Sequence, residues 1–484
     1  MKEYDVLVIG GGPGGYIAAL RTAENGLKTA LVEKDSLGGV CLNVGCIPSK
    51  SLLKNAEIAR TLRKDAKTFG FSCENLNLDY GAAVERSRKV SKRLNMGVAS
   101  LLKNAGVEVF FGKAEFVDAH TVHAVLNDGG EESIHAENII IACGTKPVEI
   151  PGMLPDGEKI LNYRQAILQP VLPGRVVIIG GGAIGVEFAT VWSGYGAAVT
   201  IVEMQSHLLP NEDAEAGAEL ERSFKKQGIK IKTGTALSAV EKTENGVVVH
   251  LKKDEEESTL EADQVVIVVG FRSNAADLLP EKAGVALTAR GWIETDSFCR
   301  TSVPHIYAIG DVAGKILLAH AAEAMGRYVG DLIAGKPAAE PRYDLMPHAT
   351  YSHPQVASFG YTEETAKAAG VDFVTGKAGF IANGKALGLG ENEGWVKLLC
   401  APDTHKILGA VLVGPETSEL LPELSLAAAH GLTAEDIVQN IHAHPTLSEV
   451  LMEAADEIRN KKYKCQRGHF AIPPSFGYRR EVTP

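Results

Sequence analysis

The sequence predicts an α/β protein with two doubly wound units, each built on a parallel sheet, and a C-terminal α+β domain. A pattern of apolar strand, glycine-rich turn and helix occurs near residue 10 and returns about 170 residues later. Each copy continues into a strand-like run that ends in an acidic residue. From about residue 346 the pattern changes, and strand-like runs precede helical ones. Alternating strands and helices are typical of parallel sheets with helices on both faces, which we expect in both units.

The first unit is built around the glycine turn GGGPGG. Its segments are an apolar run at 4–9, the turn, a helical stretch at 17–26 and a strand-like run at 28–34. Gly10, Gly12 and Gly15 form G-x-G-x-x-G, whose glycines permit a tight turn, close approach to a pyrophosphate and helix–strand packing. The N-terminus of the next helix favours the anion. These features predict a Rossmann-like dinucleotide site with Glu33 on a ribose hydroxyl; a turn without a ligand is the alternative.

The second unit repeats the arrangement from residue 175. Gly180, Gly182 and Gly185 occupy the three glycine positions, and the next strand-like run ends at Glu203. The following MQSHLLP contains no arginine that could meet a 2′-phosphate, and a carboxylate favours an unphosphorylated ribose. Two such turns in one chain predict a protein with two dinucleotides, and the second site should prefer NAD to NADP.

The remaining chain shows further coarse signals. The expected elements are helices at 50–66 and 81–105, buried strands at 138–147 and 264–274, a strand at 305–311, a helix at 318–335, and the C-terminal runs WVKLLC, ILGAVLVG and LLPELSLAAAHG. A basic, proline-containing tail begins at about Lys461 and is expected to be a surface extension.

Composition limits the classes of partner. The 484 residues carry a net charge of −11, which disfavours nucleic acid or an anionic membrane as the main partner. The N-terminus enters an apolar run at once, so we expect no signal peptide, and no run approaches the length of about 20 residues that spans a bilayer. We expect a cytoplasmic protein.

Two of the seven cysteines, Cys41 and Cys46, lie in GGVCLNVGCIPSK. Pro48 opens a predicted helix, whose N-terminus together with Lys50 should lower a thiol pKa. This favours a thiol pair that cycles with a disulfide. The alternatives are a static disulfide, two unrelated thiols, or a zinc site. With no second cysteine pair in the chain, we expect no metal.

The segment HAHPTLSE suggests a proton acceptor. His444 and Glu449 are five positions apart, and an imidazole oriented by a carboxylate can accept the proton of an attacking thiol. His442 is the weaker candidate for this base. Spacing alone leaves open that both histidines are ordinary polar loop residues.

These motifs, together with GGGAIGVEFA and IYAIGDV, resemble the pyridine nucleotide-disulfide oxidoreductases in register from about residue 3 to about 458. The resemblance implies FAD on the first unit and NAD on the second. The implied FAD contacts are Gly10, Gly12, Gly15, Glu33, Lys34, Gly39, Lys50, Ala114, Gly144, Asp311 and Ala319. The implied NAD contacts are Gly180, Gly182, Ile184, Gly185, Glu203, Leu237 and Gly270.

The resemblance also implies a division of the chain. The segments are an FAD-binding domain with the redox-active disulfide at 1–147, an NAD-binding domain at 148–274, a central region returning to the FAD at 275–345, a dimerisation domain at 346–460 and an extension at 461–484.

By the same resemblance, Cys46 is the thiol next to the flavin and Cys41 exchanges with substrate. Lys50 pairs with Glu187 near the flavin. His444 with Glu449 is the base and serves the other subunit, which implies a homodimer.

HAHPTLSE is typical of members that oxidise dihydrolipoyl groups and reduce NAD. The implied partner is the lipoylated carrier of a 2-oxoacid dehydrogenase, glycine-cleavage or other lipoyl-dependent system.

Two alternatives remain. One is another NAD(P)H-dependent disulfide reductase of the family, although the tail lacks a cysteine pair and the second unit lacks arginines for NADP. The other is a non-catalytic flavoprotein that binds a lipoyl carrier. The chain departs from the family pattern at four positions: it has Cys143 where threonine is usual, Ser273 for proline, Ala321 for lysine and Gln355 for glutamate. None of these changes a proposed catalytic residue, but they could shift the redox potential of the site.

Overall fold

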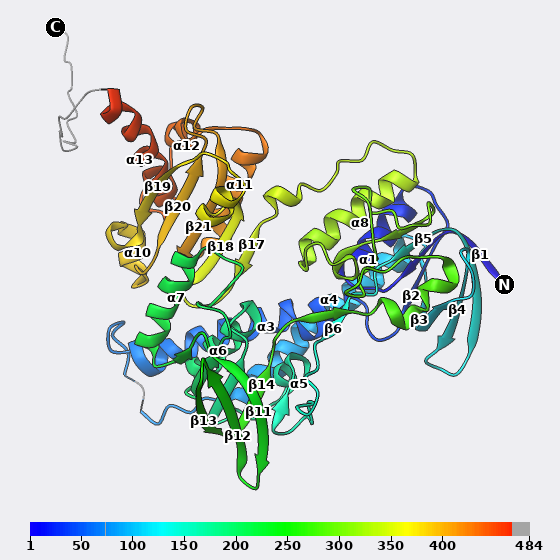
Figure 1. Ribbon diagram of the computed structural model, residues 1–484, viewed down its shortest axis with the longest axis horizontal. Coiled ribbons are helices and arrows are strands. Elements are labelled where there is room, and N and C mark those ends of the chain that lie inside the picture. Colours follow the sequence, from blue (N-terminus) through cyan, green and yellow to red (C-terminus); the bar gives the residue numbers. More distant parts are fainter. Residues whose placement is uncertain (73, 467–484) are drawn as a thin grey trace. The chain divides into compact units, whose positions relative to one another are not determined.

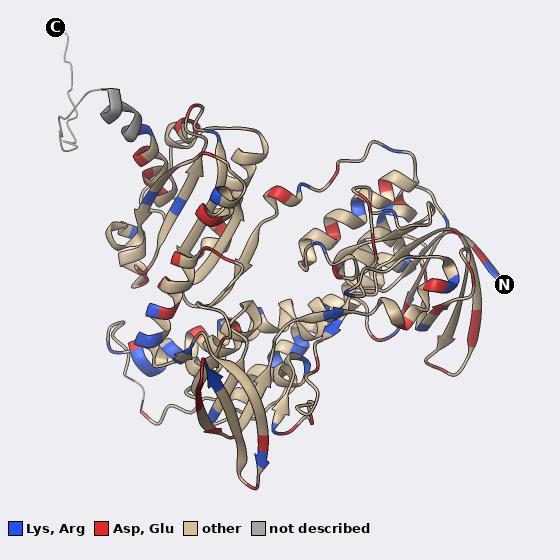
Figure 2. Cartoon of the chain, in the orientation of Figure 1, with Lys and Arg blue, Asp and Glu red and all other residues tan. Residues whose placement is uncertain are grey.

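The computed structural model describes residues 1–72 and 74–466 (Figure 1). These form two compact units. The first contains Met1–Met346 with Thr350–His353, and the second contains Pro347–Ala349 with the chain from Pro354 onward. The predicted extension lies outside the described residues from 467 onward, and the backbone of the last helix continues to Gln466. Lys and Arg are interspersed with Asp and Glu along the elements of both units (Figure 2).

The N-terminal half of the first unit is built on a six-stranded sheet in the order β1-β2-β3-β4-β5-β16. Its elements are β1 (Lys2–Ile9), α1 (Pro13–Glu24), β2 (Thr29–Glu33), α2 (Gly39–Val44), α3 (Cys46–Arg60), a π-helical turn (Thr61–Asp65), α4 (Tyr80–Asn104), β3 (Glu108–Phe116), β4 (Thr121–Leu126), β5 (Glu131–Ile141) and β6 (Thr145–Pro147), and later β16 (Ile306–Ala308) and α8 (Ala319–Ile333). The apolar run of β1 pairs in parallel with β2 and β5, so its side chains are buried on both faces.

Helices cover one face of this sheet, not both as predicted. On that face α1, α4 and α8 pack against Val6 and Val8. On the other face Leu7 and Ile9 pack against β3, β4 and the segment 275–293. Strands β3, β4 and β5 pair antiparallel, and their alternating apolar residues supply the cover that helices were expected to give.

The next segment forms a five-stranded parallel sheet in the order β10-β9-β8-β14-β7. Its elements are β7 (Ile160–Leu161), α5 (Tyr163–Leu168), β8 (Arg175–Ile179), α6 (Ala183–Tyr195), β9 (Ala198–Val202), α7 (Ala214–Gln227), β10 (Lys230–Lys232), β11 (Ala236–Thr243), β12 (Gly246–Lys253), β13 (Glu256–Ala262), β14 (Gln264–Ile267) and β15 (Phe271–Ser273). Here too the expectation of helices on both faces is wrong. Val247, Val249 and Leu251 of the antiparallel sheet β11-β12-β13 pack against Val177 and Ile179 of β8.

The predicted strands at 138–147 and 264–274 are each interrupted. Gly144 (φ +64°) and Gly270 (φ +119°) have left-handed backbone conformations that a continuous strand does not contain. The runs therefore divide into β5 and β6, and into β14 and β15. The short pieces β6 and β15 then pair with each other, which joins the two halves of the first unit.

The second unit contains a five-stranded sheet in the order β17-β18-β21-β20-β19 (Figure 1). Its elements are β17 (His348–Thr350), β18 (Gln355–Gly360), α9 (Glu363–Ala368), β19 (Val374–Gly379), α10 (Gly384–Leu389), β20 (Trp395–Cys400), β21 (Ile407–Gly414), α11 (Thr417–Ala429), α12 (Ala434–Gln439) and α13 (Glu449–Gln466). A Cβ at Gly376 would lie 2.1 Å from the Ala454 carbonyl oxygen, so glycine is required where β19 meets α13. Each helix in the described part of the chain is too short or too polar to span a bilayer.

Candidate active site

The two glycine turns have the same geometry. A Cβ at Gly15 would lie 1.8 Å from the Gly10 carbonyl oxygen, and one at Gly185 would lie 1.9 Å from that of Gly180. These glycines let each helix pack against the strand before it. At Gly12 a Cβ would meet no atom within 4 Å, so the backbone here borders open space at a helix N-terminus. Such a cradle fits a pyrophosphate.

The acidic residues that follow each turn are placed alike. The Gly11 N–H donates to Glu33 Oε2 at 2.6 Å, and the Gly181 N–H donates to Glu203 Oε2 at 2.6 Å. Burial raises the pKa of Glu33, although the N–H groups of Gly11 and Asp35 partly offset this. Both carboxylates therefore lie beside the glycine turns, where the predicted ribose contacts require them.

Asp311 provides a second test of the predicted FAD site. Its carboxylate accepts a hydrogen bond from the Thr145 hydroxyl at 3.3 Å. Burial raises its pKa to about 6, because few polar groups compensate the charge. Hydroxyl donors such as those of a ribityl chain would complete its hydrogen bonding, so the residue fits the role that the resemblance implies.

The other predicted cofactor positions lie on several elements. Lys34 follows β2, Ala114 lies opposite Ala124 within β3, Gly144 precedes β6, Ala319 opens α8, Ile184 lies in the first turn of α6, Leu237 lies at a bulge in β11, and Gly270 precedes β15. No Cβ placed at Gly144 or Gly270 would meet an atom within 4 Å, so both border open space. Ala114 is buried within the sheet.

The cysteine pair lies on two consecutive helices. Cys41 lies on the short helix α2, which the sequence did not predict, and Cys46 opens α3 two residues before the predicted start at Pro48. The hydrogen bond to Cys46 and burial raise the pKa of Cys41. The same hydrogen bond and the Lys50 charge lower the pKa of Cys46. Two cysteines placed in this way can be joined in a disulfide when an acceptor takes two electrons, and that disulfide can exchange with another dithiol.

Hydrogen bonds from three residues that the sequence did not indicate hold the short helix α2 in place. The Asn43 amide donates to the carbonyls of Leu37 and Gly39, each at 2.9 Å. From α4, Asn95 donates to the Leu37 carbonyl at 2.7 Å, and Arg88 donates to the Asn43 carbonyl. Gly39 (φ +55°) lies against the Gly12 backbone, so the cysteine segment contacts the glycine turn directly.

Lys50 and Glu187 meet as the resemblance implies. Lys50 Nζ lies 2.9 Å and 3.0 Å from the two carboxylate oxygens of Glu187. A Cβ at Gly194, two turns along α6, would lie 2.9 Å from the Ala56 carbonyl, so a glycine permits α6 to approach α3 closely. Burial favours the neutral amine, but the charge and hydrogen bonds of Glu187 outweigh it and raise the pKa of Lys50. The site therefore contains a fixed cation one turn beyond Cys46.

The two histidines of HAHPTLSE have different surroundings. His444 Nδ1 lies 2.8 Å from Glu449 Oε1, and its side chain is exposed. The N–H of Thr446 and the His444 ring lower the pKa of Glu449, which favours its carboxylate form. His442 is buried and bonds through Nε2 to Glu423 at 3.0 Å. Only His444 is therefore accessible to another molecule.

The departures from the family pattern have local explanations. Desolvation raises the pKa of Cys143 to about 12, which favours its neutral thiol form. The Ser273 hydroxyl accepts the backbone N–H two residues later at 3.0 Å. Gln355 accepts from the hydroxyl of Ser418 at 3.0 Å, a role that a carboxylate would also fill. Ala321 is completely buried in α8, and nothing in the structure explains the change from lysine.

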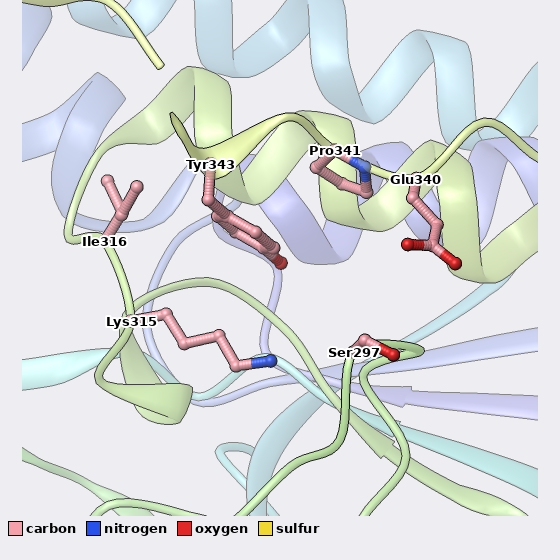
Figure 3. A pocket seen from close by; sticks show the side chains of 6 residues that line it. All are labelled: Ser297, Lys315, Ile316, Glu340, Pro341 and Tyr343. Carbon is pink, nitrogen blue, oxygen red and sulfur yellow. The ribbon is translucent and has the colours of Figure 1, made fainter. Parts of the chain in front are cut away.

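A pocket on the first unit contains none of these residues (Figure 3). It is lined by Ser297, Lys315, Ile316, Glu340, Pro341 and Tyr343. Cys299 lies beside it, with its sulfur 3.9 Å from the Tyr343 hydroxyl, but this thiol is fully buried and burial raises its pKa. Among the described residues, no three metal-ligating side chains gather in a group that could hold a metal ion.

Two dinucleotide cradles beside a pair of interacting thiols define a class of protein, the flavoprotein disulfide oxidoreductases. Residues 4–326 match the model of the pyridine nucleotide-disulphide oxidoreductases, and residues 346–455 match the dimerisation domain of that family. The chain belongs to the pyridine nucleotide-disulphide oxidoreductase family. It is accordingly an oxidoreductase that uses FAD and NAD, and it carries a dimerisation domain.

Several relatives are similar over most of the chain. Dihydrolipoyl dehydrogenase of Mycobacterium leprae is 47% identical over 94% of this chain and 97% of its own length. Dihydrolipoyl dehydrogenase of Chlorobaculum parvum is 46% identical over 94% and 96%. Among solved structures, LpdA of Mycobacterium tuberculosis has a TM-score of 0.87 at 28% identity, and covers 94% of this chain and 99% of its own. The HOCl-induced flavoprotein disulfide reductase RclA of Escherichia coli has a TM-score of 0.83 at 28% identity, with the same coverage.

Proposed function

We propose that this chain oxidises dihydrolipoyl groups carried on a lipoylated protein and reduces NAD. The placement of Cys41 on α2 and of Cys46 at the start of α3, one turn before the Lys50 cation paired with Glu187, carries the proposal. The names of the relatives with 46–47% identity agree with it. In the balanced reaction, one dihydrolipoyl dithiol and NAD⁺ give one lipoyl disulfide, NADH and a proton.

The paired thiols exchange with the substrate. In the oxidised enzyme, a substrate thiolate attacks the Cys41 sulfur, the Cys41–Cys46 bond breaks, and Cys46 leaves as a thiolate. The second substrate sulfur then attacks the first, which releases Cys41 and forms the lipoyl disulfide. FAD, when bound, supplies the electron relay between the reduced pair and NAD. The helix N-terminus and Lys50 favour the Cys46 thiolate that these exchange steps require.

His444 acts as the base in this proposal. Its exposed imidazole accepts the substrate thiol proton at Nε2, while Glu449 at Nδ1 holds the ring and stabilises the imidazolium. Because Glu449 opens α13 and His444 lies just before that helix, both within the dimerisation domain, we infer that they serve the cysteines of a second subunit in a homodimer. His442, buried against Glu423, does not take part.

The proposed partner is a lipoylated carrier of a 2-oxoacid dehydrogenase, glycine-cleavage or other lipoyl-dependent system. We place the reaction in the cytoplasm. The chain has few cysteines and no disulfide framework, and a thiol pair that is reduced and oxidised in turn is typical of a reducing compartment. Glu203 at the second cradle supports NAD over NADP.

The test is reduction of NAD by free dihydrolipoamide, followed as NADH absorbance and repeated with NADP. The intact protein should form NADH, with a much lower rate on NADP. Cys46→Ser should abolish the reaction, whereas Cys400→Ala, which changes a buried thiol in β20, should retain it. If the intact flavin-loaded protein forms no NADH from dihydrolipoamide, the proposed function is wrong.

A further inference from the structure

The Lys50 ammonium has a second neighbour besides Glu187, the ring of Tyr351. Tyr351 lies in Thr350–His353, which belongs to the same compact unit as Lys50 and Glu187. Lys50 Nζ lies 4.3 Å from the centroid of the Tyr351 ring. The Tyr351 backbone N–H also donates to Glu187 Oε1 at 3.1 Å. The cation, the carboxylate and the aromatic residue are therefore in mutual contact.

The two neighbours act on the cation differently. Glu187 binds the ammonium through two oxygens, but its negative charge also cancels much of the field of the cation. The Tyr351 ring attracts the ammonium through its quadrupole and adds no net charge. A ring at this position therefore restricts the long, flexible Lys50 side chain and leaves its positive charge available to other groups.

The positive charge of Lys50 stabilises the thiolate form of Cys46. Lys50 follows it by four residues on α3, so the two side chains lie on the same face one turn apart. We propose that Tyr351 is a positioning residue whose aromatic face holds the Lys50 ammonium beside Cys46. It thereby favours the thiolate form of the thiol that releases electrons in the catalytic cycle.

The titratable groups around this thiol come from three further elements. Cys41 on α2 donates the hydrogen bond, Lys50 on α3 supplies the cation, and Glu187 on α6 opposes the thiolate. Glu323 on α8 acts on Cys41. Tyr351 is the neutral member of the group, and its effect passes through the position of Lys50.

This inference rests on the proposed role of Cys46, but its test requires no turnover. Flavin-loaded protein carrying Cys41→Ser, in which the serine hydroxyl keeps a donor, is treated with iodoacetamide from pH 5 to 9. Alkylation of the Cys46 peptide is then quantified by mass spectrometry. If the intact protein, with both cysteines, showed no activity towards dihydrolipoamide, the proposed function would be refuted and this measurement would be unaffected.

The informative comparison is Tyr351→Leu with Tyr351→Phe. Both retain the backbone N–H to Glu187, but only phenylalanine retains an aromatic face. Tyr351→Leu should raise the pH midpoint of alkylation and slow the reaction below that midpoint by about threefold or more. Tyr351→Phe should match the parent. Tyr351→Met repeats the test if the leucine variant loses bound flavin.

A double-mutant cycle with Lys50→Met identifies the route of the effect. If Tyr351 acts by positioning Lys50, Tyr351→Leu should change nothing further once the ammonium is absent. An unchanged midpoint in Tyr351→Leu would overturn the proposal. So would a shift of equal size in the Lys50→Met background, because the ring would then act on Cys46 by another path.

Discussion

At the scale of single residues, burial separates groups that look equivalent in the sequence. His442 and His444 are two positions apart, yet their side chains are 4% and 78% exposed. Each has a carboxylate partner, so a carboxylate alone does not identify the base. Accessibility does, because a base must reach the substrate proton. The same distinction applies to the cysteines, since burial raises the pKa of Cys400 to about 12 while contact with Cys41 lowers that of Cys46.

The histidine assignment makes a prediction. His444→Gln should lower dihydrolipoamide-dependent NAD reduction by about 10²–10⁴-fold, because the attacking thiol loses its proton acceptor. His442→Gln should instead lower the melting temperature, because it weakens the buried contact with Glu423. Rates and thermal melts of both variants provide the measurement. Equal loss of activity in the two variants at unchanged stability would contradict the assignment.

At the scale of elements, one strand–turn–helix motif occurs twice with nearly the same atomic geometry. The carboxylate-to-amide distance is 2.6 Å in both copies, and the third glycine of each lies against the carbonyl of the first. The second glycine has a different role. Gly182 has an extended conformation that any residue can adopt (φ −73°, ψ −177°) and borders open space.

This difference predicts opposite outcomes for two neighbouring substitutions. Gly185→Ala should reduce the stability of the NAD-binding half by about 1–3 kcal/mol, since its Cβ would collide with the Gly180 carbonyl. Gly182→Ala should leave stability unchanged and raise the KM for NAD on the order of tenfold, because the methyl group projects into the cradle. Thermal melts and NAD titrations distinguish the two. An unchanged KM in Gly182→Ala would show that the nucleotide does not approach this turn.

At the scale of the whole molecule, the thiol pair and the histidine dyad belong to different compact units of the chain. The unit with the dyad carries the dimerisation domain of the family. It presents several exposed apolar side chains, among them Ile381, Leu387, Leu426 and Ile441. An interface between two subunits would remove such surface from water. We therefore expect each complete site to combine cysteines from one subunit with the histidine of another.

Co-expression of Cys46→Ser with His444→Gln tests this arrangement. Each variant alone should be inactive. A mixed dimer would contain one intact site, so random assembly should restore about a quarter of the parental activity. The matched control is Cys41→Ser with Cys46→Ser, which damages the same half of the site in both chains and should restore none. An inactive mixture of the first pair, with mixed dimers present, would mean that each chain uses its own histidine.

The sequence by itself located the features that depend on short spacing: both glycine turns, the acidic residue after each, the two cysteines and, with the family resemblance, the pairing of His444 with Glu449. Turn chemistry and helix N-termini act over a few residues, so such patterns can be read locally. Only the tertiary structure decided that β-structure covers one face of each Rossmann-like sheet, that α2 carries Cys41, and that Tyr351 meets Lys50. The last contact joins residues about 300 positions apart and depends on how α3, α6 and the segment 350–353 pack, for which no local pattern exists.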